Sequence, residues 1–550
     1  MKISLILILF IHNVYALNHR CGTDKLKIDL NSLKIPSKEK RIAKLSKLNA
    51  AGTYQPITIG YDFSNFYKPS SMSYRIFNNI KLLLKETREY FSKFLQVVHT
   101  NIDISDYFQD IIEVCGIYKI GKDYENFLIK NDLIIFPMIE ELEEGVIAAA
   151  APCLLDYDTM RPIGGILYIN QNLDFDAGNT ETYMKNILIH EITHILVFHP
   201  FFFENLGLSK EEGSLSYISS PKVLEQARKH FNCSLLKGVP LEDQGGEGSV
   251  GSHWETRQML GDYMISTDYP DNAISNITLA LFEDSGFYKV NYYSGGLFKF
   301  GKNKGCEFFK KKCIENGKAT FEEFCDIKDE PMCSSSRALK SSCFIYDYQF
   351  TIPYEYRYFS RSNRGGFWTA EYCPVALEFV TGTSDIFPNH CQIGTSNLSS
   401  EYGETIGQNS FCFMSSLLPE SSLNEISEIP ICYEVECDTT NNNIIVKLGS
   451  DTITCPTEGG IIDNLSGYKG SIRCPQYSDI CNNNGIVCND MFSCLNELSK
   501  NNDISSSYLD YDEGKTVDID YDFFDFYYGY DNFIKINMNY MILLILFWLI

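Results

Sequence analysis

Apolar residues recur at helical spacing in one long stretch of the N-terminal third. Ile76, Ile80, Leu83 and Phe94 follow a period close to 3.6 residues. This pattern predicts a long amphipathic helix over residues 71–98, with one face directed at a core. The polar face of this helix carries no catalytic or metal-binding motif, so we interpret the helix as scaffold.

Three shorter segments have the patterns of strands. Residues 54–63 alternate between apolar and polar positions, whereas residues 133–139 and 163–169 are almost entirely apolar and are bounded by glycine or proline. An apolar run with helical spacing follows at residues 182–198. Strands followed by a buried helix predict an α+β fold or a mixed sheet.

The helix predicted at 182–198 also contains candidate metal ligands. His190 and His194 are four residues apart, so both imidazoles lie on one helix face and can reach one ion. Glu191 lies beside them, where it can reach a water on that ion without being a ligand. This is the pattern of a zinc hydrolase, although a core helix with two incidental histidines gives the same five residues.

Composition and charge narrow the class of protein. The chain has 550 residues, of which 44% are hydrophobic and 21% charged, as in globular proteins of two to four domains. The net charge of -24 argues against a nucleic-acid partner, because phosphate binding needs clustered Lys and Arg. The glycines at 245–248 follow no predicted strand and precede no Lys-Ser/Thr pair, which argues against a phosphate-binding loop.

The first residues predict export. An apolar run after Lys2 ends at Val14-Tyr15-Ala16, which indicates a signal peptide over residues 1–16. The chain has 19 cysteines, and 15 of them lie from Cys306 to Cys494, so we expect a disulfide-rich region over residues 301–500. Four Asn-x-Ser/Thr sequences are acceptors for glycans in that compartment. The predicted location is therefore extracellular or the cell surface.

The two ends of the mature chain differ in composition. Residues 17–52 are rich in Lys and Ser and are expected to be a pro-segment. Cys21 within it is the cysteine left over from an odd total; it is either a free or intermolecular thiol or a ligand that keeps a metal site latent. Residues 501–538 predict an acidic stalk, and the apolar tail at 539–550 is too short to span a bilayer. That tail could be a lipid-anchor signal, a short membrane anchor or a buried end.

A catalytic zinc needs a third protein ligand, and the residues alone leave three choices open. His199 is closest in sequence, but the compact metal motif would place the ligand one residue later, at Pro200. A glutamate on a following element, at 211, 212 or 225, is the second choice. His253, beyond a long insertion, is the third.

Several separated motifs resemble the leishmanolysin family of surface metalloproteases, a metzincin group with a long insertion before the third histidine. The resemblance covers most of residues 18–494. Its motifs, in chain order, are His19-Arg20-Cys21, Arg161-Pro162-Ile163-Gly164-Gly165, the helix motif at 190–194, Gly251-Ser252-His253-Trp254-Glu255, Met264, the stretch from Leu279 to Tyr288, the glycine-bounded stretch from Gly301 to Cys306, and the stretch from Cys474 to Cys481.

The resemblance implies a fold and a set of roles. The fold would be a metzincin-type catalytic domain at 53–300 with an insertion at 200–252, followed by the disulfide-rich region. One Zn²⁺ per chain would be held by His190, His194 and His253, with Glu191 as general base for a metal-activated water. Met264 would form the turn beneath the metal, and Cys21 would be the latency switch. Substrates would be proteins or peptides, and a C-terminal lipid anchor would attach the chain to a membrane.

One residue departs from the family pattern. Glycine is expected three residues after the second histidine, because a helix often ends there with positive φ, and here the residue is Val197. Either the chain turns elsewhere, near His199-Pro200, or the site is distorted. We therefore keep two hypotheses: a zinc-dependent endopeptidase, and a catalytically weak or inactive homologue that acts as a cell-surface adhesion or binding protein.

Overall fold

The computed structural model describes residues 36–99, 113–114, 118–119, 131–143, 145–172, 180–244, 249–267, 269, 272–292, 298–377, 389–396, 398–482 and 485–486. The expected signal peptide, Cys21, the acidic stalk and the apolar tail lie outside these residues. The chain combines helices and short strands, as predicted. Its first elements are α2 (Lys38–Ala51), β1 (Tyr54–Pro56), β2 (Ile59–Tyr61), α3 (Tyr74–Phe94), β3 (Leu95–Val98), β4 (Glu113–Val114), β5 (Tyr118–Lys119), β6 (Leu133–Glu140), β7 (Ala148–Leu155), β8 (Pro162–Asn170) and α6 (Thr180–Leu196).

A four-stranded sheet supports the site. Its order is β2-β6-β8-β7; β2, β6 and β8 are parallel, and β7 is antiparallel at one edge of the described strands. The predicted strands at 133–139 and 163–169 are β6 and β8. The predicted strand at 54–63 instead splits into β1 and β2, which belong to different sheets. β7 was not predicted.

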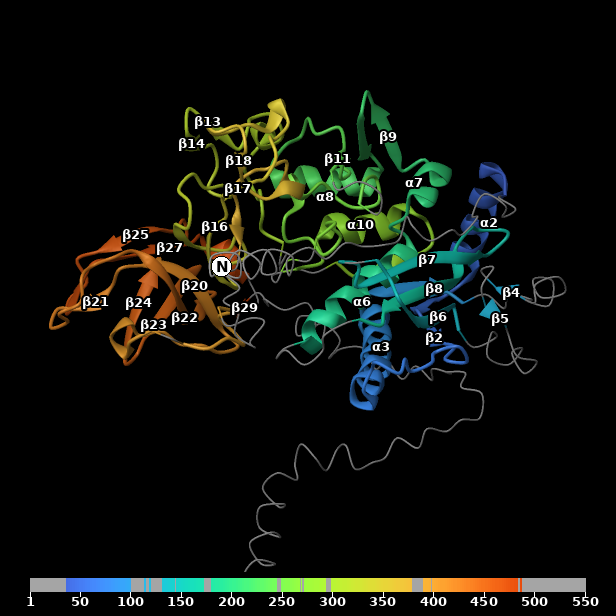
Figure 1. Cartoon of the computed structure of the whole chain (residues 1–550), viewed down its shortest axis with the longest axis horizontal. Helices are drawn as coiled ribbons and strands as arrows, with labels where there is room; N and C mark the ends of the chain where they lie inside the picture. The colour runs from blue at the N-terminus through green and yellow to red at the C-terminus, as the bar shows by residue number, and fades with distance from the viewer. Residues whose placement is uncertain are drawn as a thin grey trace, which may run out of the picture. The chain divides into compact units, whose positions relative to one another are not determined.

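Two long helices cover the sheet. α6 lies against β7 and β8, and α3 lies against α6 (Figure 1). α3 begins where Ser73 accepts a hydrogen bond from the Ile76 amide, a normal N-cap. It ends at Phe94, earlier than the predicted residue 98. The last four residues form β3, which pairs with β1 and β12 (Lys289–Val290); its side chains are alternately buried and half-buried, and Val97 and Val98 are β-branched residues that favour strands.

The chain between the end of α6 and residue 300 packs onto the same hydrophobic core. Its elements are α7 (Pro200–Leu206), β9 (Ser209–Glu212), β10 (Leu215–Ile218), α8 (Pro221–Phe231), β11 (Val239–Pro240), α9 (Thr256–Met259), α10 (Asn276–Asp284) and β12. The Asp284 carboxylate at the end of α10 accepts hydrogen bonds from the amides of Lys222 and Val223 in the first turn of α8. A negative charge at a helix N-terminus is favourable, so this contact fixes the insertion against α10.

The following segment has only short elements, but it shares the core. Phe300, Phe308, Phe324 and Val375 are buried in the same hydrophobic cluster as α3, α6 and the sheet. Its elements are η3 (Cys306–Phe309), β13 (Ile314–Glu315), β14 (Lys318–Ala319), β15 (Pro331–Cys333), β16 (Lys340–Cys343), β17 (Tyr346–Asp347), η4 (Tyr354–Tyr356), β18 (Arg364–Gly365), η5 (Trp368–Ala370) and β19 (Ala376–Leu377). The next element, η6 (Ser400–Tyr402), packs through Tyr402 on the C-terminal core described below. The core of the site-bearing half therefore extends to residue 377.

A separate core lies under a six-stranded sheet near the C-terminal end of the described chain. The sheet order is β24-β23-β22-β20-β27-β25, and its buried residues form their own cluster. The elements are β20 (Ser410–Ser415), β21 (Leu418–Pro419), β22 (Ile429–Asp438), β23 (Asn443–Leu448), β24 (Asp451–Cys455), β25 (Gly460–Asp463), β26 (Tyr468–Lys469), β27 (Ser471–Cys474), α11 (Tyr477–Ile480), β28 (Cys481–Asn482) and β29 (Gly485–Ile486).

Disulfides are dense in the second half, as predicted. The described pairs are Cys233–Cys306, Cys313–Cys373, Cys325–Cys343, Cys333–Cys412, Cys391–Cys432, Cys437–Cys481 and Cys455–Cys474. Cys455 ends β24 and Cys474 ends β27, strands that are not neighbours in the sheet. This bond therefore crosslinks two separate parts of the sheet.

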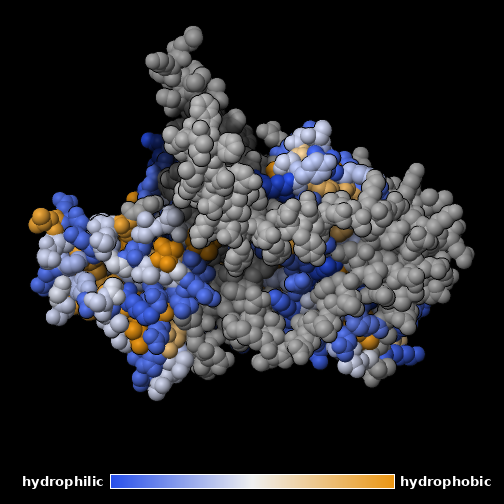
Figure 2. Space-filling view, turned by 90° about the horizontal axis from the view of Figure 1, so that it is seen from below, coloured by the Kyte–Doolittle hydropathy of each residue, from blue (hydrophilic) through white to orange (hydrophobic). Residues whose placement is uncertain are grey.

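Two features bear on contact with a membrane: the surface of the C-terminal sheet region and one long apolar helical stretch. On the face drawn in Figure 2, hydrophobic side chains of the C-terminal sheet region are scattered among hydrophilic ones. In the described part of the chain, one helical stretch, Tyr183–Leu206, is long and apolar enough to cross a bilayer, and 89% of its most apolar window is buried. A buried helix of this kind is typical of a protein core.

Candidate metal centre

Three histidines converge inside the core. His190 and His194 are presented by α6 one turn apart, and their Nε2 atoms are 3.0 Å from each other. His253, 63 positions from His190 along the chain, brings its Nε2 within 3.2 Å of the Nε2 of His190. All three side chains are buried. The structure therefore brings the three predicted ligands to one point.

The outer nitrogens of the rings are held by backbone oxygens. His190 Nδ1 lies 2.6 Å from the carbonyl oxygen of Tyr263, and His194 Nδ1 lies 2.6 Å from that of Phe198. His253 Nδ1 is 3.1 Å from the carbonyl oxygen of Ser249. A carbonyl can only accept, so the Nδ1 atoms of His190 and His194 carry the proton and their Nε2 atoms direct lone pairs at the common centre. The Nδ1 of His253 also lies 3.0 Å from the Ser252 hydroxyl oxygen, and we assign the same tautomer to His253 because the Ser249 carbonyl oxygen can only accept.

The protonation states suit a metal. Burial lowers the pKa of His190 to about 4, despite the opposing hydrogen bond to Tyr263, and burial lowers the pKa of His194 well below its usual value. Both rings are therefore neutral near neutral pH, which is the form that binds a metal. Three imidazole nitrogens around a tetrahedral zinc at about 2.05 Å would lie about 3.3 Å apart, close to the spacing found here. The donor set fits zinc.

Glu191 and Met264 are both buried. Glu191 is fully buried on α6 between the two histidines of that helix. Met264 is also fully buried, and its carbonyl oxygen accepts a hydrogen bond of 2.9 Å from the amide of Trp254, the residue after His253. The turn that contains Met264 is therefore fixed directly to the segment that carries the third histidine.

Asp262 holds that turn together, and sequence reasoning missed it. One oxygen of its buried carboxylate accepts from the Met264 amide at 2.8 Å. The other accepts from the Thr278 hydroxyl at 2.8 Å, and that hydroxyl accepts from the Trp254 indole at 2.7 Å. A lone aspartate in the apolar run Gly261-Asp262-Tyr263-Met264-Ile265 was the available indication, because a buried carboxylate needs several donors.

The other two choices for a third ligand lie elsewhere. His199 is the N-cap of α7, where its Nδ1 accepts from the Phe201 amide at 3.2 Å. Glu211 and Glu212 are exposed on β9, and Glu225 is exposed on α8. None of these residues belongs to the histidine group that could hold an ion among the described residues.

Val197 does not distort the end of α6. The helix ends at Leu196, and the amides of Val197 and Phe198 both donate to the Thr193 carbonyl oxygen, at 3.0 and 2.9 Å. Val197 is not among the residues with positive φ, and its side chain is fully buried. The chain turns without the backbone conformation that favours glycine, and α7 then begins at Pro200 as a helix start with proline at its first position.

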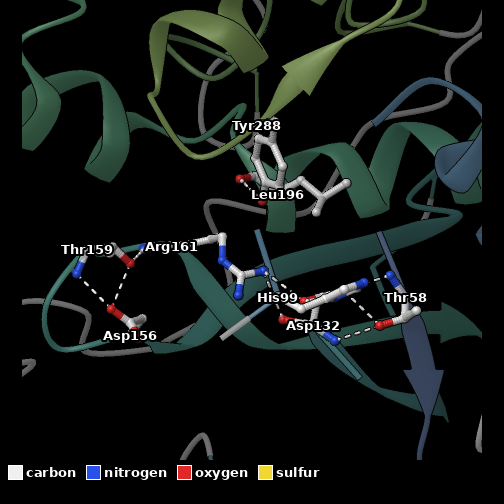
Figure 3. A network of polar contacts seen from close by, with 8 residues as sticks. All are labelled: Thr58, His99, Asp132, Asp156, Thr159, Arg161, Leu196 and Tyr288. Carbon is white, nitrogen blue, oxygen red and sulfur yellow. Dashed lines mark hydrogen bonds and ion pairs between the residues drawn. The ribbon is translucent and has the colours of Figure 1, made fainter. Parts of the chain in front are cut away.

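Arg161 lies at the base of the sheet and contacts none of the three histidines among its described contacts. Its guanidinium donates to the Asp132 carbonyl oxygen at 3.3 Å and lies 3.8 Å from the Asp132 carboxylate (Figure 3). The same carboxylate accepts from Thr58 and from His99 Nδ1. Figure 3 also shows Tyr288, whose hydroxyl donates to the Leu196 carbonyl oxygen at the end of α6, at 3.2 Å.

The paired glycines after Arg161 are packing glycines, not the glycines of a tight turn. Gly164 and Gly165 are within β8, and a Cβ at Gly165 would overlap Ile195 of α6. Glycine thus lets α6 lie close to β8. β8 is paired on both sides. The two edges of this sheet among the described residues are β2 and β7, and β7 is the edge strand that lies against α6.

A second acidic group stabilises the segment before His253. Glu242 accepts hydrogen bonds from the Thr256 hydroxyl at 2.9 Å, the Ser266 hydroxyl at 3.2 Å and the Gln244 amide at 2.9 Å. Burial raises the pKa of Glu242 to about 8. These contacts connect the insertion, α9 and the turn after Met264, so Glu242 fixes the path of the chain around the third histidine.

Comparison with known proteins gives a consistent result. A family model described as leishmanolysin matches residues 78–487. The chain is 28% identical over 395 residues to a leishmanolysin homolog of Crithidia fasciculata, covering 67% of this chain and 58% of that protein. It is 26% identical over 393 residues to leishmanolysin of Leishmania tropica, covering 68% and 58%.

A third relative comes from an animal. The chain is 30% identical over 298 residues to a leishmanolysin-like peptidase of Drosophila melanogaster, covering 48% of this chain and 43% of that protein. The matched regions thus span 43% to 58% of the length of these three relatives.

Proposed function

This chain belongs to the leishmanolysin family, and from that membership and its three converging imidazoles we propose that it is a zinc-dependent endopeptidase. The observation that carries the proposal is the direction of the lone pairs. Three buried Nε2 atoms face one point, and backbone carbonyls fix the protons on the opposite nitrogens. Three converging neutral imidazole nitrogens are a donor set that suits a bound cation.

The ligands of one Zn²⁺ would be His190, His194 and His253. When bound, the ion supplies Lewis-acid chemistry, polarising a peptide carbonyl and making water a better nucleophile. Glu191 would accept the proton from the attacking water and later give it to the leaving amine. Glu191 is fully buried on α6, next in sequence to the first of these histidines. Met264 would line the floor of the site.

The substrate would bind as an extended peptide along β7. Among the described residues this strand is one of the two edges of the sheet, and it is the edge that lies against α6, which carries two of the histidines. Backbone groups of an edge strand can pair with an extended chain, so the substrate would be held by its main chain. Proteins or peptides, rather than nucleic acids, are the substrates that this arrangement fits.

The proposed life cycle is that of an exported precursor. The dense disulfides support an extracellular or cell-surface location reached through the secretory pathway. We retain the pro-segment at 17–52 with Cys21 as its latency switch, and the C-terminal lipid anchor, as proposals. The boundaries of the catalytic domain at 53–300 and of the disulfide-rich region at 301–500 are proposals as well.

The alternative, a catalytically silent binding protein, had one supporting residue, Val197. Because the chain turns after α6 without positive φ, Val197 no longer favours that alternative. No other described residue among the expected catalytic and metal-binding positions departs from the family pattern. We therefore prefer the peptidase.

The ligand set can be tested by zinc content. We expect one zinc per chain in the wild type and loss of zinc in His253→Ala. His199→Ala is the matched control, because His199 is a half-buried histidine close in sequence to His194 that caps α7. Zinc content that is unchanged in His253→Ala, or lost in His199→Ala but not in His253→Ala, would contradict the assignment.

A further inference from the structure

The helix α2 lies within the expected pro-segment, yet it is packed on the body of the protein. It lies beside α7 and the end of the sheet where β7 turns into β8 (Figure 1). Its sequence, KEKRIAKLSKLNAA, has five basic residues and one acidic residue. The chain as a whole carries a net charge of -24, so α2 is a basic element on an acidic protein.

Arg41 is the buried anchor of this contact. Its side chain is only 6% exposed, and its guanidinium donates to the Asn205 carbonyl oxygen in α7 at 3.0 Å. The same group lies 3.3 Å from the sulfur of Met160 in the β7–β8 turn. Burying an arginine is costly unless its donors are satisfied, and here the Asn205 carbonyl oxygen accepts from one of them.

The β7–β8 turn also offers a matching charge. Asp158 lies 3.2 Å from the ammonium of Lys40 and 2.8 Å from that of Lys44. The turn is rigid, because the Asp156 carboxylate accepts hydrogen bonds from the Asp158 and Thr159 amides. Asp158 is thus presented to α2 by a preformed loop.

A third point of contact is apolar. Leu45 of α2 packs on Gly286, so that a Cβ at this glycine would lie 3.3 Å from the Leu45 Cδ1 atom. Gly286 has φ of +78° and directly follows the end of α10. The face that receives α2 is therefore built from three segments: the β7–β8 turn, α7 and the turn after α10.

The helix depends on this face for its existence. An isolated helix of 14 residues is marginal in water, even for sequences with high helix propensity. Most helical stability in proteins comes from tertiary packing. α2 should therefore be helical when docked and largely unfolded when released.

We infer that the face formed by Asp158, Met160, Asn205 and Gly286 is a docking surface for a basic helix, and that α2 is its occupant. α2 anchors the segment before the catalytic body through contacts that involve no metal. The interpretation of α2 as part of a removable leader rests on the proposed function, whereas its docking does not. Because the face includes the turn at the end of β7, release of α2 frees the edge strand from that contact.

Hydrogen exchange on the full chain tests this inference without any assay of catalysis. The chain carries Glu191→Ala throughout, so that self-cleavage cannot remove the segment. We expect the amides of 38–51 to be protected, and Asp158→Lys to make them exchange about tenfold faster, because attraction to two lysines becomes repulsion. Arg41→Met, which keeps the aliphatic stem but removes the donors, should have a larger effect.

Two controls make the result specific. Glu211→Lys makes the same charge change on an exposed acid of β9 and should leave the exchange of α2 unchanged. Adding Lys40→Glu and Lys44→Glu to Asp158→Lys should restore protection. Amides of β7 and β8 report in the same experiment whether the sheet remains folded.

The outcomes separate the inference from the proposed function. The docking surface is wrong if the α2 amides exchange as in an unfolded peptide when the docking surface carries no substitution. It is also wrong if these amides exchange equally fast in Asp158→Lys and Glu211→Lys. If α2 is protected as expected but the protein with native Glu191 cleaves no peptide bonds, the docking surface stands and the peptidase fails.

Discussion

The half that carries the histidines and the C-terminal sheet are stabilised in different ways. In the first half, segments from Ile57 to Leu377 share one hydrophobic core, and the polar groups of the site are held by backbone carbonyls and a buried carboxylate. In the second, a six-stranded sheet covers a much smaller core and is crosslinked by disulfides. A small core depends more on crosslinks. The larger core also contains the Cys233–Cys306 and Cys313–Cys373 disulfides, but the histidines themselves are held by packing and hydrogen bonds.

This difference has a consequence for how the protein can be perturbed. Removal of a crosslink should weaken the C-terminal sheet and leave the histidine centre intact. Small changes in the buried polar network around the centre should do the reverse. The variants below probe one half or the other, from the largest expected effect to the smallest.

Replacing Cys455 and Cys474 together by alanine should destabilise the C-terminal sheet by about 3 kcal/mol, because the bond closes a loop with a sequence separation of 19. Denaturant unfolding, followed by hydrogen exchange in β22 and β23, measures the loss. Zinc content should stay unchanged. Loss of zinc in this variant would show that the two halves are not independently stabilised.

Val197→Gly should destabilise the site-bearing half by roughly 2–3 kcal/mol. The substitution removes a fully buried side chain and adds backbone freedom at a position without positive φ. Thermal unfolding measures the cost, and Val197→Ala separates the loss of side-chain volume from the backbone effect. A glycine variant that is more stable or more active than the wild type would mean that valine strains the end of α6.

Asp262→Asn should cost about 1–2 kcal/mol of stability and weaken zinc binding roughly tenfold. The amide keeps one acceptor for the Met264 amide, but its NH₂ group cannot accept from the Thr278 hydroxyl. Asp243→Asn is the control, since Asp243 is only half-buried. The visible spectrum of the cobalt-substituted protein should change in the first variant only. An unchanged spectrum and affinity would reduce Asp262 to an ordinary core residue.

The smallest effect concerns pH. The hydrogen bond to Asp132 raises the pKa of the half-exposed His99, so protonated His99 stabilises the folded state. This contribution is complete below the usual value of 6.5 and is lost as pH rises through the higher folded pKa. Solvent screening limits it to less than about 1 kcal/mol. Melting temperatures across this range should fall less in His99→Gln than in the wild type; equal slopes would contradict the assignment.

Periodicity predicted the elements whose own sequence has a clear apolar pattern. The helix α3, the strands β6 and β8 and the helix α6 were all expected, because their apolar residues recur with a clear period or form unbroken runs. β7 was missed, since its run Ala148–Leu155 is rich in alanine and contains Pro152, both uncommon in strands. The strand β3 was merged with the preceding helix because its partners lie far away in the sequence.

The site was predicted unevenly for the same reason. Helical spacing alone pairs His190 with His194, but nothing local connects them to His253, which only the family resemblance singled out. Asp262 and the close packing at Gly165 depend on tertiary contacts with Thr278 and Ile195. Such contacts cannot be read from one sequence, because residues of the same type elsewhere have no comparable partners.

Cleavage of a denatured general protein substrate tests the central claim most directly. The protein should first be freed of residues 17–52 and shown by metal analysis to hold zinc, and the assay should be run with and without a zinc chelator beside Glu191→Ala. We predict cleavage that the chelator abolishes and that the variant lacks while still binding zinc. No cleavage by the folded, zinc-loaded, processed protein would contradict the account, as would cleavage that survives loss of Glu191.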